Sequence, residues 1–259
     1  HVRSRRQRQM CIRDSRMSLT EAGTRYYEQV ARILDDLQEA EQSLGPMQRE
    51  PAGLLRVSAP MSLSLLRICP AVPAFLERYP QVSLDLNLED RRVDIVKEGF
   101  DLAIRGTDRL EDSSLVARKL MTLDHVLCGA PSYFRRVGMP ASPEAVRGME
   151  RVQFTLSGHA DEWVFTRAGQ TQRVPVQGRY KVSSSLAVRD ALRAGFGVSL
   201  VPRVYVQDDL DQGALQAVLA DWLPVETYVY AVYPSRRHMV AKVRAFVDFL
   251  VEELGARQP

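Results

Sequence analysis

The sequence has few cysteines, few aromatic residues and no long apolar run. Its 259 residues include three cysteines, Cys11, Cys69 and Cys128, which lie far apart and form no CxxC pair. An odd number of separated cysteines argues against a disulfide framework. Cys69 and Cys128 stand in apolar surroundings, so we expect buried thiols in a reducing, cytoplasmic setting. No stretch reaches the roughly 18 apolar residues of a membrane-spanning helix, and no membrane partner is expected.

The N-terminal segment is basic but carries no apolar stretch behind it, so it does not resemble a secretory signal. Residues 1–16 hold six arginines, including Arg16, and one aspartate, a net +5 in a chain of net +3. A basic arm of this kind binds nucleic acid weakly through phosphate contacts. The segment has no helical or strand periodicity, and RQRQMCIRDS resembles translated adapter sequence. Residues 1–15 are therefore expected to be non-native or disordered.

Residues 20–44 predict a long helix with one narrow apolar seam. Thr20 is a favourable N-cap, and Gly45-Pro46 ends the helix. The remaining faces are polar, and apolar residues at alternating spacings of four and three are typical of a helix that pairs with another helix. A surface helix packed on its own domain is the alternative. We expect dimerisation through Tyr26, Val30, Ile33, Leu37, Ala40 and Leu44.

After a linker at 46–52, strands and helices alternate along the chain. Strict alternation of apolar and polar residues marks VSLDLNL as a strand with one polar face. The order β-α-β-α-β predicts a parallel sheet with right-handed crossovers. In this first region strands are predicted at 54–59, 82–88 and 101–105, and helices at 62–79 and 91–98.

A further region begins near Asp124 and continues the α/β pattern. Several short strands are expected within 150–182, with turns at Ser157-Gly158 and Ala168-Gly169. Longer strands are predicted at 125–130, 197–202 and 227–234, a shorter one in LQAVL, and helices at 131–138, 185–194 and 239–254.

Several segments resemble, in order and spacing, the LysR-type transcriptional regulators. MSLTEAGTRYYEQVARIL resembles the end of that family's winged helix-turn-helix and the start of its linker helix. Six further segments resemble the effector-binding domain of the family: GLLRVSAP, FLERYPQVSLDLNL, EGFDLAIR, SSLVARKL, GFGVSLVP and YAVYPSRRHMVAKVRAFVDFLVEEL. The resemblance covers residues 16 to about 254.

The resemblance implies an α/β fold, namely a two-subdomain, periplasmic-binding-protein-like (type 2) effector domain preceded by a long linker helix. Subdomain I would comprise 53–122 and 226–254, and subdomain II 123–225. Residues 16–45 would be the remnant of the wing and the dimerising linker helix. The recognition helix of the family is missing, so promoter DNA is expected to be a partner of the full-length parent only. A homodimer or homotetramer and a small-molecule effector are the other implied partners.

The ligand site is expected where parallel strands end and helices begin. Residues 58–62 and 183–185 form two such junctions, and serine hydroxyls with helix N-termini suit anions. Each serine is alternatively a plain N-cap. Arg105 is expected either to pair with a ligand carboxylate or to form a salt bridge with Glu98 or Asp101. Phe196, Val201 and Pro202 would form the apolar wall or simply pack.

The resemblance places the effectors of this family between the subdomains, near these positions. We therefore expect one small, anionic organic effector there. The candidate ligand-binding residues are Ser58, Pro60, Met61, Ser62, Arg105, Ser184, Ser185, Phe196 and Pro202.

Catalytic motifs are not found. The four histidines form no HExxH pattern, and Ser199 lacks the second glycine of a GxSxG nucleophile elbow. Glu89 and Asp90 are adjacent at a strand end and are expected to point apart, which does not suit paired-carboxylate catalysis. The segment from His159 to Glu162 is expected to be a polar loop. No enzymatic activity, metal or cofactor is therefore expected.

A solute-binding protein of a transporter is the other class considered. It would share the two-subdomain fold. It would require an export signal and would not need the dimerising helix. The resemblance and the apolar seam favour the transcriptional regulator.

Overall fold

The computed structural model describes residues 23, 26, 27, 29, 30, 33, 50–91, 93–107, 115–224, 226–234 and 240–255. The chain forms two units, His1–Arg49 and Glu50–Pro259, and each is considered by itself. In the described ranges no helix combines the length and the apolar character that crossing a membrane requires.

In the first unit the described residues between 23 and 33 are helical, as predicted. Tyr26 and Ile33, two residues of the predicted seam, leave 70% and 64% of their surface exposed within this chain. Val30 is half-buried. Leu37, Ala40, Leu44 and Arg16 lie outside the described residues, so dimerisation through the seam stays a prediction.

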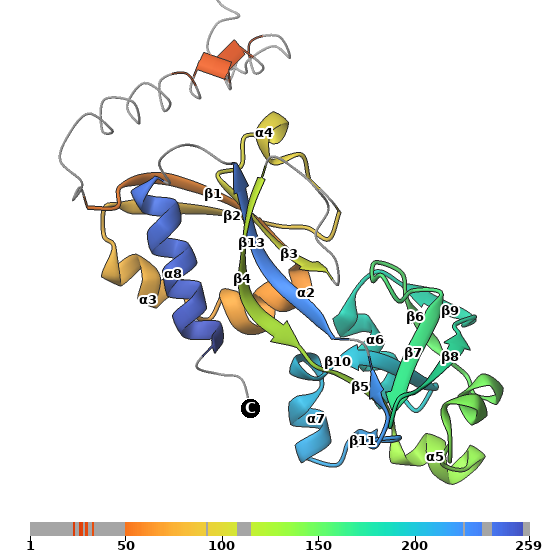
Figure 1. The fold of residues 1–259 in the computed structure, drawn as a ribbon. Helices are drawn as coiled ribbons and strands as arrows, with labels where there is room; N and C mark the ends of the chain where they lie inside the picture. Colours follow the sequence, from red (N-terminus) through yellow and green to blue (C-terminus); the bar gives the residue numbers. More distant parts are fainter. Residues whose placement is uncertain are drawn as a thin grey trace, which may run out of the picture. The chain divides into compact units, whose positions relative to one another are not determined.

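The first half of the second unit is built on a five-stranded mixed sheet (Figure 1). Its order is β2-β1-β3-β13-β4; β1 pairs in parallel with β2 and β3, whereas β13 runs antiparallel to β3 and β4. The predicted parallel arrangement of the first three strands is therefore confirmed. The strands are β1 (Gly53–Ala59), β2 (Val82–Leu88), β3 (Leu102–Thr107), β4 (Leu115–Leu123) and β13 (Thr227–Pro234).

The helix predicted at 62–79 is wrong as a single helix. It is divided into α2 (Met61–Leu63), the π-helical η1 (Ser64–Ile68) and α3 (Val72–Arg78). Pro70 and Pro73 have no backbone N–H to continue the hydrogen-bond ladder. The chain turns between η1 and α3, and Pro73 is accommodated in the first turn of α3. The π-helical turn ends where the Cys69 N–H donates to the Ser64 carbonyl over 2.8 Å.

The helix predicted at 91–98 is shorter than expected. It is α4 (Ile95–Glu98), and it begins after Asp94, whose carboxylate accepts the Lys97 N–H at 3.1 Å. Gly99 ends it in the left-handed conformation, with φ of 71°, as the sequence predicts.

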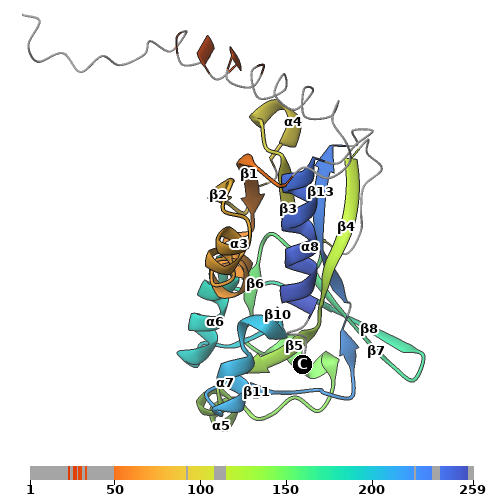
Figure 2. The same ribbon diagram turned by 90° about the vertical axis from the view of Figure 1, so that its left-hand side faces the viewer.

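The core of this half lies between the sheet and helices α3 and α8 (Ala241–Gly255), which cover one of its faces (Figures 1 and 2). Phe75 of α3 is fully buried. Its ring packs edge-on against Phe246 of α8, with ring centroids 4.8 Å apart. Phe249 follows at 5.3 Å. This aromatic cluster joins the two helices over the strands.

The second half contains three small sheets with the orders β10-β5-β11, β12-β7-β8 and β6-β9. The predicted turn at Ala168-Gly169 joins β7 to β8, but the LQAVL strand is only two residues long. The strands are β5 (His125–Gly129), β6 (Val152–Phe154), β7 (Glu162–Arg167), β8 (Gln170–Pro175), β9 (Tyr180–Val182), β10 (Val198–Pro202), β11 (Gln216–Ala217) and β12 (Leu223–Pro224).

Short helices surround these sheets. They are α5 (Pro131–Val137), η2 (Pro143–Gly148), α6 (Ser185–Arg193), η3 (Arg203–Tyr205) and α7 (Gln207–Asp211). Cys128 is fully buried here, as predicted, whereas Cys69 in the first half is only half-buried. Both thiols are free.

The chain passes between the two halves twice. It leaves the first sheet after β4 and enters β5 one residue later, and it returns between β12 and β13. Tyr205 of η3 packs into the hydrophobic core of the first half, so the halves also touch through side chains. The predicted limits of the subdomains, at 122–123 and 225–226, stay a prediction.

Candidate functional site

A cavity of about 480 Å³ lies between the two halves and is lined by residues from both. Its volume is within the usual range for small-molecule sites. On the side of the first half, the carboxyl ends of β1, β2 and β3 meet at it, since Pro60 and Ser62 follow β1, Asp90 follows β2 and Arg105 lies near the end of β3. Ligands of parallel α/β sheets bind at this end of the strands.

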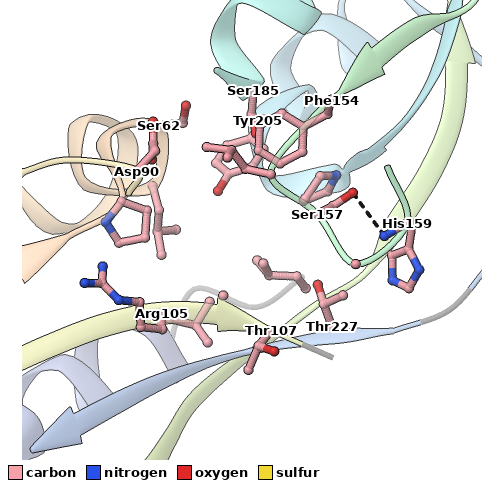
Figure 3. A pocket seen from close by; sticks show the side chains of 18 of the residues that line it. Ser62, Asp90, Arg105, Thr107, Phe154, Ser157, His159, Ser185, Tyr205 and Thr227 are labelled. Carbon is pink, nitrogen blue, oxygen red and sulfur yellow. Dashed lines mark hydrogen bonds between the residues drawn. The ribbon is translucent and has the colours of Figure 1, made fainter. Parts of the chain in front are cut away.

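The second half contributes helix starts, loops and aromatic side chains. Ser185 begins α6, Tyr205 ends η3 and Phe154 ends β6. Figure 3 shows Ser62, Asp90 and Arg105 on one side of the cavity, with Ser157 and His159 on the opposite side.

Five of the predicted ligand-binding residues line this cavity and four do not. The four that do not line it are Ser58, Met61, Ser184 and Phe196. The contacts or the exposure of each of these residues show where it lies instead. The five that line it are Pro60, Ser62, Arg105, Ser185 and Pro202.

Ser184 and Ser185 separate the two roles that serine has at a helix start. The Ser184 hydroxyl caps α6, because it accepts the Ala187 N–H at 3.4 Å. Ser185 is 6% exposed and lines the cavity. Its hydroxyl has no hydrogen-bond partner among the residues that the structure describes. The capping alternative therefore holds for Ser184 and not for Ser185.

Ser62 resembles Ser185 on the opposite half. It is 4% exposed and lines the cavity, and within the described ranges its hydroxyl also lacks a hydrogen-bond partner. Helix α2 has Pro60 at its N-cap position and no side-chain cap. Buried hydroxyls are normally hydrogen-bonded, so both serines are suited to a bound ligand.

Ser58, Met61 and Phe196 do not line the cavity. Ser58 is buried in β1, where its hydroxyl accepts from Arg105 Nη2 at 3.3 Å. The side chain of Met61 is 42% exposed and does not line the cavity. Phe196 follows the turn at the end of α6 and packs edge-on against Tyr180, with ring centroids 6.0 Å apart.

Arg105 lines the cavity and is held by its own half of the molecule. Its Nη1 donates to the Ile104 carbonyl at 3.2 Å. The two acids proposed as its partners pair elsewhere: Glu98 with Arg91 and Asp101 with Lys242. The guanidinium is thereby positioned at the cavity wall.

Glu89 and Asp90 both line the cavity, and their carboxylates have different partners. They follow the last residue of β2, and the side-chain alternation of a strand no longer applies in the loop. Glu89 forms an ion pair with Arg91 at 2.5 Å. Asp90 Oδ1 accepts the Met61 N–H at 3.0 Å.

His125 and His159 line the cavity from the second half, with ring centroids 6.1 Å apart. His125 Nδ1 lies 3.1 Å from the Leu123 carbonyl. A carbonyl only accepts, so Nδ1 carries the proton in the neutral ring. Burial, with the nearby His159 adding to it, lowers the pKa of His125 to about 4. The ring is therefore neutral at physiological pH.

The loop that carries His159 is fixed by a buried amide. Gln153 Nε2 donates to the Ala160 carbonyl at 3.0 Å and to Asp161 Oδ1 at 3.1 Å. Within the described residues, no group of three or more His, Cys, Asp or Glu side chains is arranged to hold a metal ion. Nothing in the sequence spacing indicated that this loop and the start of β5 would meet.

Comparison with known proteins decides the family. Residues 48–255 match the LysR substrate binding domain family. The chain belongs to the LysR-type transcriptional regulators. Among LysR-type relatives, the probable HTH-type transcriptional regulator LtrA of Klebsiella pneumoniae is 31% identical over 244 residues, 93% of this chain and 79% of LtrA. PtxR of Pseudomonas aeruginosa is 32% identical over 245 residues, 94% of this chain and 78% of PtxR.

Solved LysR-type regulators have the same fold. CrgA from Neisseria meningitidis matches with a TM-score of 0.71 and 31% identity, covering 94% of this chain and 83% of CrgA. The full-length Vibrio cholerae virulence activator AphB matches with a TM-score of 0.70 and 29% identity, covering 91% and 80%. The two-subdomain, periplasmic-binding-protein-like fold is thus confirmed, and these relatives do not support the transporter alternative.

Proposed function

We propose that this chain is the effector-sensing part of a cytoplasmic LysR-type regulator that has no enzymatic activity. Its effector is a small anionic organic molecule, and it binds in the cavity between the subdomains. Promoter DNA is contacted by the full-length regulator as a homodimer or homotetramer. The relatives, which are named transcriptional regulators, support this assignment.

One observation carries the choice of an anion. Ser62 and Ser185, on opposite halves, are both buried and both line the same cavity without a hydrogen-bond partner in the described part of the chain. Ser185 is also the first residue of the nine-residue helix α6, whose N-terminal amides and dipole favour negative charge. Arg105 adds a cation at the wall.

The rest of the wall fits an organic rather than an inorganic anion. Apolar side chains dominate between the polar groups, and small-molecule sites typically combine such a wall with a few placed polar groups. The apolar members of the lining include Ile95, Leu115, Phe154, Leu200 and Val232.

Contacts to both halves explain how the ligand acts. A molecule that bonds Ser62 and Ser185 together binds best when the two halves are close, and it shifts the population toward that arrangement. The two chain passages between the sheets bend to accommodate the shift. In the assembled regulator this movement changes how the subunits hold DNA. By linkage, the effector changes the affinity for DNA by the same factor by which DNA changes the affinity for the effector.

Native mass spectrometry of protein purified gently from the producing cells tests the proposal. We expect one small acid retained per chain, and its loss from a Ser62→Ala/Ser185→Ala double variant. Ser184→Ala is the matched control and should keep the acid. Equal retention in the double variant, or retention of an apolar or cationic compound, would contradict the anionic site.

A further inference from the structure

The cavity carries one acidic side chain whose charge is not balanced by an ion pair. Glu89 forms an ion pair with Arg91, with Oε2 and Nε 2.5 Å apart, and shares that guanidinium with Glu98. The neighbouring Asp90 lines the same cavity. Among the described residues it has no ion-pair partner, and the Met61 N–H is its only hydrogen-bond donor.

Asp90 holds its position through one carboxylate oxygen and leaves the other for the cavity. Oδ1 accepts the Met61 N–H at 3.0 Å, at the start of α2. An internal anion therefore already satisfies the backbone donor at this helix start. Oδ2 has no donor within the described ranges, and Figure 3 shows Asp90 on the same side of the cavity as Ser62.

The field of Asp90 reaches across the cavity to the second half. Tyr205 is buried and lines the cavity, and its pKa is raised, mainly by burial and further by the negative charge of Asp90. A second anion placed beside Asp90 would be repelled in the same way. A ligand acid is therefore disfavoured directly beside Asp90 and favoured near Ser185, at the start of α6.

An unbalanced carboxylate in a largely apolar cavity favours a cation. We propose that the effector is zwitterionic: its acid group is bound near Ser185 and a protonated amine is bound by Asp90. This inference rests on the anionic site proposed above and narrows its ligand to small amino acids and related amino-carboxylates. Asp90 is then the residue that rejects plain carboxylic acids.

Matched ligand pairs that differ only in the amine test the assignment. The probes are L-leucine with isocaproate, L-phenylalanine with hydrocinnamate, and γ-aminobutyrate with butanoate, titrated by calorimetry into the whole chain. We expect the best amino-carboxylate to bind at least about tenfold more tightly than its amine-free partner, the usual effect of one hydrogen bond between charged groups.

Asp90→Asn removes the charge but keeps an oxygen that accepts the Met61 N–H, so the fold is preserved. In this variant we expect the preference to vanish or to reverse in favour of the plain acid. Asp85→Asn is the matched control, because Asp85 is exposed, pairs with Arg56 and lies outside the cavity lining. A merely structural role for Asp90 would weaken both members of each pair equally.

The outcomes separate this inference from the proposed function. If plain carboxylates bind wild type as well as or better than their amino partners, and Ser185→Ala weakens them, the anionic site stands and the role of Asp90 is refuted. If the amine preference is present but survives Asp90→Asn, the selection by Asp90 is refuted. If neither member of any pair binds, the anionic effector and this inference both fall.

Discussion

The hydroxyl of Ser184 caps helix α6, whereas the hydroxyl of Ser185, the next residue, is left for the cavity. We therefore propose that these two adjacent serines serve stability and binding separately. Sequence motifs alone do not distinguish these roles, since both residues stand at the same helix start.

This pair gives the first prediction. Ser184→Ala removes a cap and should lower the free energy of unfolding by roughly 1 kcal/mol while leaving effector affinity unchanged. Ser185→Ala should instead weaken binding of the effector about ten- to a hundredfold, the loss of roughly 1.5–3 kcal/mol expected for a hydrogen bond to a charged group. Thermal melts with and without effector measure both quantities. Equal effects of the two variants on affinity would refute the separation.

His125 should make the folded state sensitive to acid. Its pKa is lowered from 6.5 to about 4 in the folded chain, mainly by burial, so the unfolded state binds its proton first. The stabilisation is complete above pH 6.5 and is lost as the pH falls from 6.5 to about 4. The loss should approach roughly 3 kcal/mol at the low end.

Urea unfolding at a series of pH values measures this loss. His125→Asn cannot be protonated, so its free energy of unfolding should fall less steeply than that of wild type over the same interval. Carboxylates contribute equally to the pH dependence of the free energy of unfolding in both proteins. Their contribution therefore cancels when the two curves are subtracted. Parallel curves for wild type and variant would show that His125 is not shielded in the folded state.

The thiol of Cys128 should be unreactive toward alkylating reagents in the folded chain. It is fully buried, and burial raises the pKa of its thiol to about 12, so neither the thiolate nor access is available. We expect iodoacetamide at about pH 8 to label Cys69, which is half-buried, well before Cys128. Peptide mapping locates the label, and unfolding in urea should abolish the difference. Labelling of Cys128 at the rate of Cys69 in the folded chain would contradict its burial.

The seam of the N-terminal helix should govern assembly. Tyr26 and Ile33 leave most of their surface exposed within one chain, which suits contact with a second copy. Leu37→Asp places a charge in the seam and should shift the oligomer toward monomer, because an unpaired charge is costly to bury. Sedimentation velocity checks the change. If wild type and variant have the same mass in solution, the seam is not part of the interface.

Local sequence patterns predicted the strands better than the helices. The alternation in VSLDLNL gave β2 with its observed limits, Val82–Leu88, because a strand with one polar face has a simple period of two. The helix from 62 to 79 was wrong, since Pro70 and Pro73 interrupt the backbone hydrogen bonds. These prolines separate the helical turns before Pro70 from α3.

Only part of the candidate site could be predicted from the sequence. The rule that ligands bind at the carboxyl ends of parallel strands located Ser62 and Arg105, and it also applies to Asp90 after β2. His125 and His159 were not predicted as part of the site, because they meet only when β5 and the loop after β6 come together in the second half. The spacing of these residues along the chain does not indicate that they meet in the folded structure.

Fluorescence of Trp163 tests the central claim most directly. The chain has two tryptophans; Trp163 lines the cavity, whereas Trp222 does not and lies beneath Arg167. In a Trp222→Phe background, titration with the compound retained from cells should change Trp163 emission. Ser62→Ala, on the opposite half, should move the same titration to about ten- to a hundredfold higher concentration. In a Trp163→Phe variant only Trp222 reports on the ligand; if the emission changes in that variant alone, a ligand bound between the subdomains is contradicted. A titration midpoint that Ser62→Ala leaves unchanged would contradict it as well.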